Sequence, residues 1–148
     1  MSNAAAAEIP RLAIDVQVMF FDTDCAAIVH NLAYLRFIET ARTLLAEQLG
    51  LNLQDMARTG LYPVLVRTEI DYKRAASLGD KLAIHARLES VERSRFWCAF
   101  EVRRPMDDLL ICTARQMLAM VQMPGSKLVR MPDDWADKYA HLHPKRSR

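Results

Sequence analysis

Glycine is scarce in this sequence, which has only four among 148 residues. Because glycine adopts left-handed backbone conformations most readily, each of the four is expected to mark a required turn. Gly50 follows a helical pattern, Gly60 and Gly79 precede strand-like runs, and Gly125 follows one. The chain also lacks an apolar run long enough to span a bilayer, so no membrane span is expected.

Charge and cysteine usage exclude several classes of protein. The formal net charge is only +2, which gives no reason to expect a nucleic-acid partner. The three cysteines, Cys25, Cys98 and Cys112, form no C-x-x-C pair, and the N-terminal segment lacks the basic region of a signal peptide. Free thiols in a reducing cytoplasm are therefore expected. No cluster has metal-ligand spacing, and no metal is expected.

Hydrophobic periodicity predicts five strands and one long helix. With 51% hydrophobic and 26% charged residues, the composition is that of an ordered domain. The long helix is expected to begin at Asn31 as its N-cap and to stop before Gly50. Alternating or helical spacing defines the ranges, which are strands over 11–20, 64–73, 81–92, 95–104 and 109–123, and helices over 31–49, 53–58 and 133–140.

The order of these elements indicates an α+β domain in which an antiparallel sheet curls around the long helix. The domain is expected to cover 9–135, with flexible termini at 1–8 and 136–148. Short linkers favour antiparallel neighbours among the last four strands. Apolar residues at outward positions of two strands, Trp97, Ala99 and Ala119, suggest that a second subunit covers the outer face.

An acidic turn, Asp22-Thr23-Asp24, separates the first strand from the long helix. Unpaired backbone N–H groups at a helix start can polarise a carbonyl oxygen, and a nearby carboxylate can act as general base or nucleophile. The alternative is ordinary turn chemistry, in which the carboxylates bond to neighbouring N–H groups. From spacing alone, this second interpretation is the better one.

A longer stretch resembles the signature of the 4-hydroxybenzoyl-CoA thioesterase family, which includes the YbgC-type acyl-CoA thioesterases. Its Asp-x-Asp turn is followed by Ile28-Val29, by Tyr34-Leu35-Arg36-Phe37, and by Glu39 and Ala41-Arg42. The run from Ile70 to Ala76, followed by Gly79-Asp80, and the strand from Leu109 to near Pro124 are also similar to the family. The resemblance spans roughly Leu12 to Trp135 and agrees with the expected order of elements.

The resemblance implies a hotdog fold whose subunits pair, often into tetramers, with an active site at the interface near the helix N-terminus. It implies hydrolysis of an acyl-CoA or acyl-carrier-protein thioester, in which coenzyme A belongs to the substrate and no cofactor is needed. Asp24 would be the catalytic carboxylate, and a backbone N–H near Asn31 would polarise the thioester carbonyl. Tyr34 would lie at the substrate site. An acidic helix residue is catalytic in some other hotdog thioesterases, but Glu39 is expected here to be structural or to support the site residues.

Three positions depart from the family pattern. Ala27 replaces a glycine, Phe20 replaces a tyrosine, and His30-Asn31 replaces Tyr-His, so that the histidine lies one residue earlier. His30 is a candidate for a role related to that of the usual histidine. The departures favour one alternative, a hotdog protein that binds acyl-CoA without hydrolysing it. A hydratase-type hotdog protein, using His30 with an acid, is a weaker alternative.

Two groups of cations are candidates for binding the phosphates of coenzyme A, because arginine binds phosphate well. The first, Arg93-Ser94-Arg95, lies at the turn between two expected strands, where an exposed hairpin tip is the alternative interpretation. The second is the pair Lys73-Arg74. Cys25, next to Asp24, is expected to be a packing residue, since a neighbouring carboxylate opposes thiolate formation.

Overall fold

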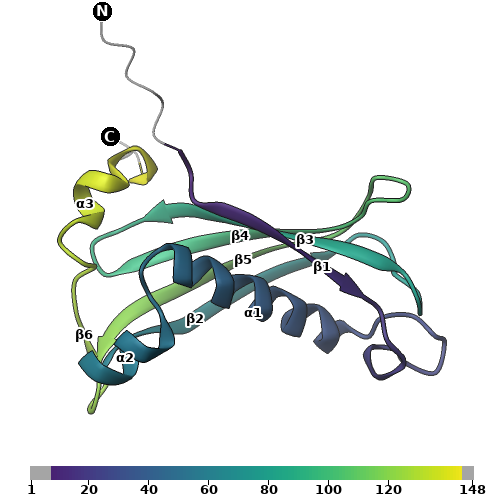
Figure 1. Cartoon of the computed structure of the whole chain (residues 1–148), viewed down its shortest axis with the longest axis horizontal. Coiled ribbons are helices and arrows are strands. Elements are labelled where there is room, and N and C mark those ends of the chain that lie inside the picture. Colours follow the sequence, from purple (N-terminus) through teal and green to yellow (C-terminus); the bar gives the residue numbers. More distant parts are fainter. Residues whose placement is uncertain (1–7, 145–148) are drawn as a thin grey trace, which may run out of the picture.

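The computed structural model describes residues 8–144, in which one antiparallel sheet curves around a long helix, α1 (Asn31–Gln48) (Figure 1). The strand order is β1-β3-β4-β5-β2, and a two-residue strand pairs with the end of β5 on the side opposite β2. The bounds are β1 (Arg11–Gln17), β2 (Leu61–Tyr72), β3 (Lys81–Val91), β4 (Arg95–Arg104), β5 (Leu109–Gln122) and β6 (Lys127–Leu128). The structure therefore confirms the α+β architecture expected from the sequence.

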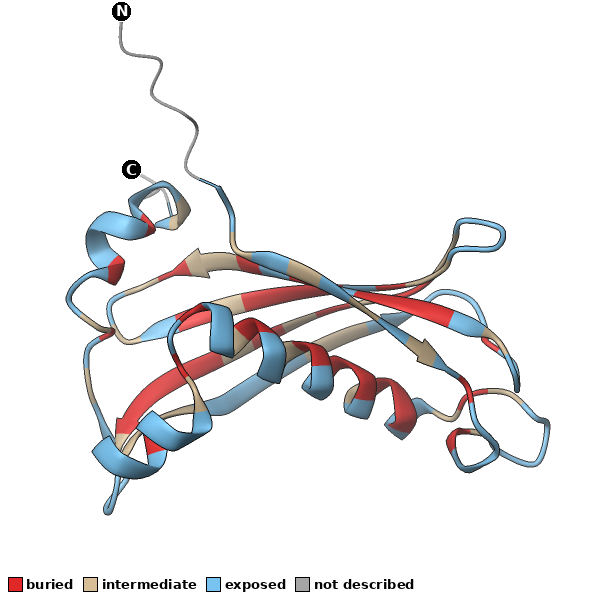
Figure 2. Ribbon diagram, viewed as in Figure 1, coloured by how far each residue is buried: buried red, intermediate tan, exposed pale blue. Residues whose placement is uncertain are grey.

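The core lies between α1 and the concave face of the sheet, where the buried residues gather (Figure 2). The helix buries one stripe and leaves the opposite stripe in solvent, as its 3.6-residue period requires. That stripe consists of Ala33, Tyr34, Phe37, Ile38, Ala41 and Leu45. The inward positions of β3 alternate with exposed Lys81, His85 and Arg87, which confirms the predicted pattern of this strand.

The β2 strand departs from the expected alternation. The sequence places Val64 and Tyr72 on one face, but a bulge between Leu65 and Arg67 shifts the register by one residue. As a result Tyr72 opposes the buried Cys112, whereas Val64 opposes Ala119. In addition, β2 pairs with β5 and not with β3, so it forms one edge of the sheet.

The N-cap of α1 is His30, one residue earlier than expected. Its Nδ1 accepts a hydrogen bond from the backbone N–H of Ala33 at 3.2 Å, so an imidazole nitrogen fills the role usually taken by an Asn or Ser oxygen. Asn31 is instead the first residue of the helix. The second helix, α2 (Leu53–Thr59), is capped by Asn52 and ends at Gly60, whose φ is 73°.

The C-terminal segment packs onto the sheet beyond the domain end expected at 135. It contains α3 (Trp135–Lys138) and a 3-10 turn, η2 (Ala140–Leu142). Trp135 and Tyr139 are both buried, and Trp135 stacks edge-on against Phe96 with ring centroids 5.5 Å apart. Of the segments expected to be flexible, 1–7 and 145–148 lie outside the described residues. No helix within residues 8–144 combines the length and hydrophobicity needed to cross a bilayer.

Candidate active site

Asp24 lies in a tight loop that leads from the 3-10 turn η1 (Phe20–Asp22) to the start of α1. Its backbone N–H donates to the carbonyl of Ile28 at 2.9 Å, and its own carbonyl accepts from Ala27 at 3.0 Å. One carboxylate oxygen, Oδ1, accepts from the N–H of Ala26 at 2.8 Å. The other oxygen has no partner among residues 8–144, and the side chain is exposed. Asp24 thus shapes its turn and still presents a carboxylate oxygen to solvent.

Asp22, the first acid of the turn, has a different environment. It is only 2% exposed, and its carboxylate accepts from the N–H of Met19 at 2.9 Å and from the guanidinium of Arg36 at 2.6 Å. Its carbonyl accepts from the N–H of His30 at 3.0 Å. Asp22 therefore links the segment after β1 to the start of α1 and to its second turn. The sequence alone does not distinguish the role of Asp22 from that of Asp24, although Arg36 stands in the same motif.

The start of α1 offers unpaired hydrogen-bond donors close to this loop. The loop is held by an isolated bridge between Thr23 and Val29, and a second bridge joins Ile28 to Ser77. Within residues 8–144, the N–H groups of Asn31 and Leu32 have no acceptor. Such groups at the positive end of a helix can stabilise a developing negative charge on a carbonyl oxygen.

Ala27, at the position where the family pattern has glycine, adopts a left-handed backbone conformation. Its φ is 58°, in the left-handed region, which L-residues with a Cβ disfavour by roughly 1–2 kcal/mol. Its carbonyl accepts from the N–H of Leu78 at 3.0 Å. Its N–H donates to the carbonyl of Asp24, so hydrogen bonds hold the backbone on both sides of Ala27. The tight turn is therefore retained despite the methyl group.

Two tyrosines lie behind the start of α1. Tyr34, expected at the substrate site, is 3% exposed, and its hydroxyl accepts from the N–H of Ala76 at 3.4 Å. Burial raises the pKa of Tyr34, which keeps the hydroxyl neutral. Tyr72 donates from its hydroxyl to the carbonyl of Asn31 at 3.3 Å, and burial also raises its pKa. Sequence reasoning placed Tyr72 in a strand but did not place its hydroxyl at the helix start.

The two candidate phosphate-binding groups lie at opposite ends of the sheet. Lys73 and Arg74 directly follow Tyr72, and both of their N–H groups bond to the carbonyl of Ile111. They are exposed at the same end as Asp24. Arg93, Ser94 and Arg95 lie at the β3–β4 turn, about 33 Å along β3 from Lys81 at that end. One subunit therefore brings Lys73 and Arg74, but not the turn cations, to the Asp24 end.

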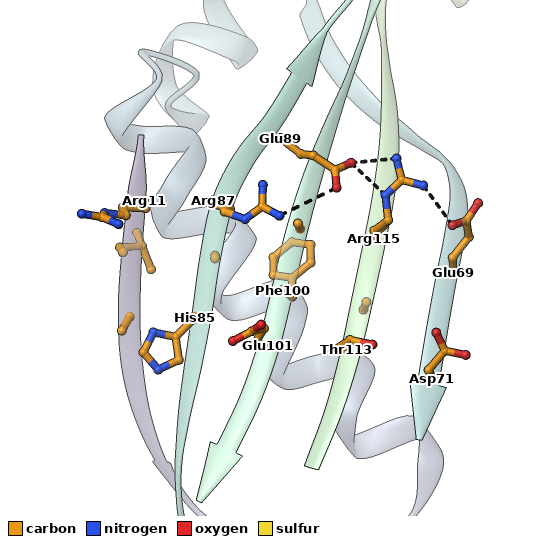
Figure 3. Close-up of a pocket in the computed structure, with 15 residues that line it drawn as sticks. Arg11, Glu69, Asp71, His85, Arg87, Glu89, Phe100, Glu101, Thr113 and Arg115 are labelled. Atoms are coloured by element: carbon orange, nitrogen blue, oxygen red, sulfur yellow. Dashed lines mark hydrogen bonds and ion pairs between the residues drawn. The ribbon is translucent and has the colours of Figure 1, made fainter. Parts of the chain in front are cut away.

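A hollow of about 650 Å³ lies on the outer face of the sheet, away from α1 (Figure 3). Arg115 crosses it, with ion pairs to Glu89 at 2.7 Å and to Glu69 at 3.1 Å. The guanidinium of Arg115 also lies 4.2 Å from the ring centroid of Trp97. Trp97 is thus shielded within the chain, and the buried Ala99 and Ala119 expose little surface. The surface around Trp97 is therefore charged, and coverage of the outer face by a second subunit stays a prediction.

The thiols and carboxylates of the described residues form no metal centre: no group of three or more His, Cys, Asp or Glu side chains in residues 8–144 could hold an ion. Burial raises the pKa values of Cys98 and Cys112 to about 12, so both remain thiols at neutral pH. Cys25 is exposed, which differs from the packing role expected for it.

Comparison with known proteins identifies the family to which this chain belongs. The family model described as "Thioesterase-like superfamily" matches residues 18–139. The chain is 30% identical over 128 residues to the acyl-CoA thioesterase YbgC of Haemophilus influenzae, covering 86% of this chain and 93% of that protein.

Solved structures agree with this match. The 1,4-dihydroxy-2-naphthoyl-CoA thioesterase Slr0204 of Synechocystis superposes with a TM-score of 0.78 and 25% identity, over 90% of this chain and 99% of that one. The DHNA-CoA thioesterase of Staphylococcus aureus, at 19% identity and over 89% and 90% of the two chains, has the same fold with a TM-score of 0.78. The chain therefore belongs to the thioesterase-like superfamily and has its hotdog fold.

Proposed function

We propose that this protein hydrolyses an acyl-CoA thioester, or an acyl-carrier-protein thioester, to a free acid and a thiol. The observation that carries the proposal is the short loop that joins Asp24 to the unpaired N–H groups of Asn31 and Leu32. A carboxylate and an anion-stabilising helix start at one place are the two elements that acyl transfer to water needs. The names of the relatives, both acyl-CoA thioesterases, support the substrate class.

In this mechanism the thioester carbonyl oxygen accepts hydrogen bonds at the start of α1. The exposed Asp24 oxygen takes a proton from water, whose oxygen attacks the carbonyl carbon. The tetrahedral oxyanion then collapses, the C–S bond breaks, and the thiolate leaves and is protonated. Alternatively, the Asp24 carboxylate attacks the carbonyl carbon itself, and water hydrolyses the resulting anhydride. Both routes require Asp24 to be ionised.

In this proposal the role of His30 is structural, as the N-cap of α1, more than one of proton transfer. Its Nδ1 accepts the Ala33 N–H, which requires that nitrogen to be unprotonated. A hydratase-type reaction would use the same ring as its acid–base group, and protonation at Nδ1 would remove the cap of α1. Coenzyme A phosphates are assigned to Lys73 and Arg74, which lie at the Asp24 end; the turn at Arg93 would require another subunit.

The proposed assembly is a homo-oligomer built on the free edge of β2. This edge strand is 12 residues long and exposes three consecutive apolar side chains, Val64, Leu65 and Val66. A long exposed edge strand invites pairing with another strand. Pairing of two β2 strands around a two-fold axis gives a dimer, and two dimers could associate into a tetramer. The proposed location is the cytoplasm, in keeping with the free thiols.

The experiment is a panel of acyl-CoA esters with a thiol reagent as readout, together with chromatography of the acid released. The expected result is stoichiometric appearance of thiol and acid for at least one ester. Tight calorimetric binding of esters with no thiol release would support the non-catalytic alternative instead. An Asp24→Asn variant should release no thiol, and Asp15→Asn is its matched control, since Asp15 is an exposed acid on β1.

A further inference from the structure

A second hollow lies under the C-terminal half of α1, on the concave side of the sheet. Its volume is about 230 Å³, and its walls come from α1, α2, β2, β4 and β5. We name it the Arg42 pocket; it is lined by Arg42 and mainly by apolar side chains, among them Leu51, Met56, Pro63, Leu65, Phe96 and Leu118. For scale, a cavity of roughly 150 Å³ lined by apolar side chains can bind benzene.

Arg42 is the one cationic side chain among the residues that line this pocket. Its guanidinium donates to Oε1 of Gln116, a neutral side chain that is 2% exposed and that in turn donates to Oγ1 of Thr68 at 3.2 Å. None of the ion pairs within residues 8–144 involves Arg42. The remaining N–H groups of Arg42 therefore lack an acidic partner in a partly buried position.

The other ionisable groups of the pocket do not neutralise this charge. Glu47 lines the pocket but is exposed and makes no ion pair with Arg42. Cys98 lies near Arg42, yet burial raises the pKa of its thiol to about 12, so it stays neutral. An unpaired guanidinium beside apolar walls fits a ligand that is apolar along its length and ends in a carboxylate, which arginine binds through paired N–H groups.

The inner face of β2 connects the proposed reaction centre to the pocket. Its inner-face residues run from Tyr72, bonded to the carbonyl of Asn31, through the exposed Thr68 to Leu65 and Pro63 at the pocket. Along α1, Asn31 and Arg42 are about 16 Å apart. An extended chain advances about 1.2 Å per bond, so this distance corresponds to about 13 bonds.

We propose that the Arg42 pocket holds the far end of the acyl group and that this end is a carboxylate. The substrates would then be monothioesters of linear dicarboxylic acids of about 12–14 carbons. This inference rests on the proposed function, because the thioester carbonyl is placed at the start of α1. Arg42 is a specificity-determining residue in this scheme and takes no part in the chemical step.

The experiment compares tetradecanedioyl-CoA with tetradecanoyl-CoA, which differ only at the far end of the chain, in wild type, Arg42→Met and Arg42→Lys. Wild type should prefer the dicarboxylic ester by about 10- to 100-fold in kcat/KM. Arg42→Met should lose this preference through a rise in KM for the dicarboxylic ester alone, and Arg42→Lys should retain part of it. Circular dichroism checks that each variant is folded.

Two further measurements distinguish a failure of the dicarboxylate inference from a failure of the proposed hydrolysis. A series from hexanedioyl-CoA to hexadecanedioyl-CoA should show its optimum at 12–14 carbons; an optimum at six or eight carbons would overturn the inference. Calorimetry with tetradecanedioic acid needs no turnover, so binding that Arg42→Met weakens tenfold would support the pocket even if the protein hydrolyses nothing. Equal preference ratios in wild type and Arg42→Met, with equal binding of the acid, would overturn the inference while leaving the proposed hydrolysis intact.

Discussion

The guanidinium of Arg36 donates a 2.6 Å hydrogen bond to the carboxylate of Asp22, and this contact ties the second turn of α1 to the acidic turn. Arg36 is half exposed, whereas the carboxylate that it compensates is 3% exposed. A buried carboxylate that loses its only charged partner is left with its desolvation cost. The loop that carries Asp24 therefore depends on a neighbouring acid with a structural role.

The first prediction concerns this pair. Arg36→Met should lower the free energy of unfolding by about 2 kcal/mol, because Asp22 would lose a charge-assisted hydrogen bond. Urea denaturation measures the change. Arg58→Met is a matched control, since Arg58 and Asp55 form a solvent-exposed pair whose loss should change stability little. Equal stability of the two variants would show that the Asp22 contact contributes no more than a surface pair.

The second prediction is a gain in stability from a substitution at Ala27. Ala27→Gly should raise the free energy of unfolding by about 0.5–1 kcal/mol, because glycine tolerates the φ of 58° that alanine disfavours. Ala26→Gly is the control, because Ala26 has no positive φ and its replacement should give no gain. Thermal and urea denaturation would measure both variants. A loss of stability in Ala27→Gly would contradict the backbone conformation described for this turn.

Thiol accessibility gives a third prediction. Cys25 is exposed, while Cys98 and Cys112 are buried. A thiol reagent at pH 8 should therefore modify one thiol per folded chain quickly and all three after denaturation. Cys25→Ser should abolish the fast phase. Fast modification of two or more thiols in the folded protein would show that the core is more open than described.

Burial of the Cys98 thiol makes the free energy of unfolding depend on pH. Burial raises the pKa of Cys98 from 9.0 to about 12 in the folded chain, so the unfolded chain loses this proton at lower pH than the folded one does. The contribution of the Cys98 thiol to stability is therefore fully present below about pH 9 and is lost as the pH rises toward 12. Cys98→Ala should therefore show a shallower fall in unfolding free energy between pH 9 and 11 than wild type. Identical slopes would contradict the burial of this thiol.

The β2 edge leads to a fifth prediction. Val66→Lys should shift the protein toward a smaller species in light-scattering chromatography, because a charged side chain on an edge strand opposes pairing. Leu128→Lys is matched to it, since Leu128 is equally exposed but lies on the two-residue β6. Unchanged assembly in Val66→Lys, or an equal shift in Leu128→Lys, would remove β2 as the interface.

The sequence predicted most of the fold because its periodicities are strong. The stripe of α1 and the alternation of β3 follow directly from helix and strand geometry. The bulge after Leu65 could not be predicted in this way, because one inserted residue leaves no distinct signal in an alternating run. The pairing of β2 with β5 is likewise a matter of tertiary packing between strands far apart in the sequence.

The candidate site was only partly accessible from the sequence. Asp24 followed from a resemblance, since Asp-x-Asp turns are common and their spacing favours ordinary turn chemistry. The different roles of Asp22 and Asp24 depend on burial, which the sequence Asp22-Thr23-Asp24 does not reveal. The hydroxyl of Tyr72 and the unpaired charge of Arg42 depend on contacts across the fold. The same holds for the distance that separates Arg93 from Asp24.

The most direct test of the central claim is the ratio of kcat/KM for wild type and Asp24→Asn on one hydrolysed acyl-CoA ester. Asparagine keeps a carbonyl oxygen that can accept the Ala26 N–H, so the turn and the fold should be preserved. The side chain can no longer act as a base or a carboxylate nucleophile. We expect a loss of about 1,000-fold or more with unchanged stability and assembly. Hydrolysis within tenfold of wild type would contradict it.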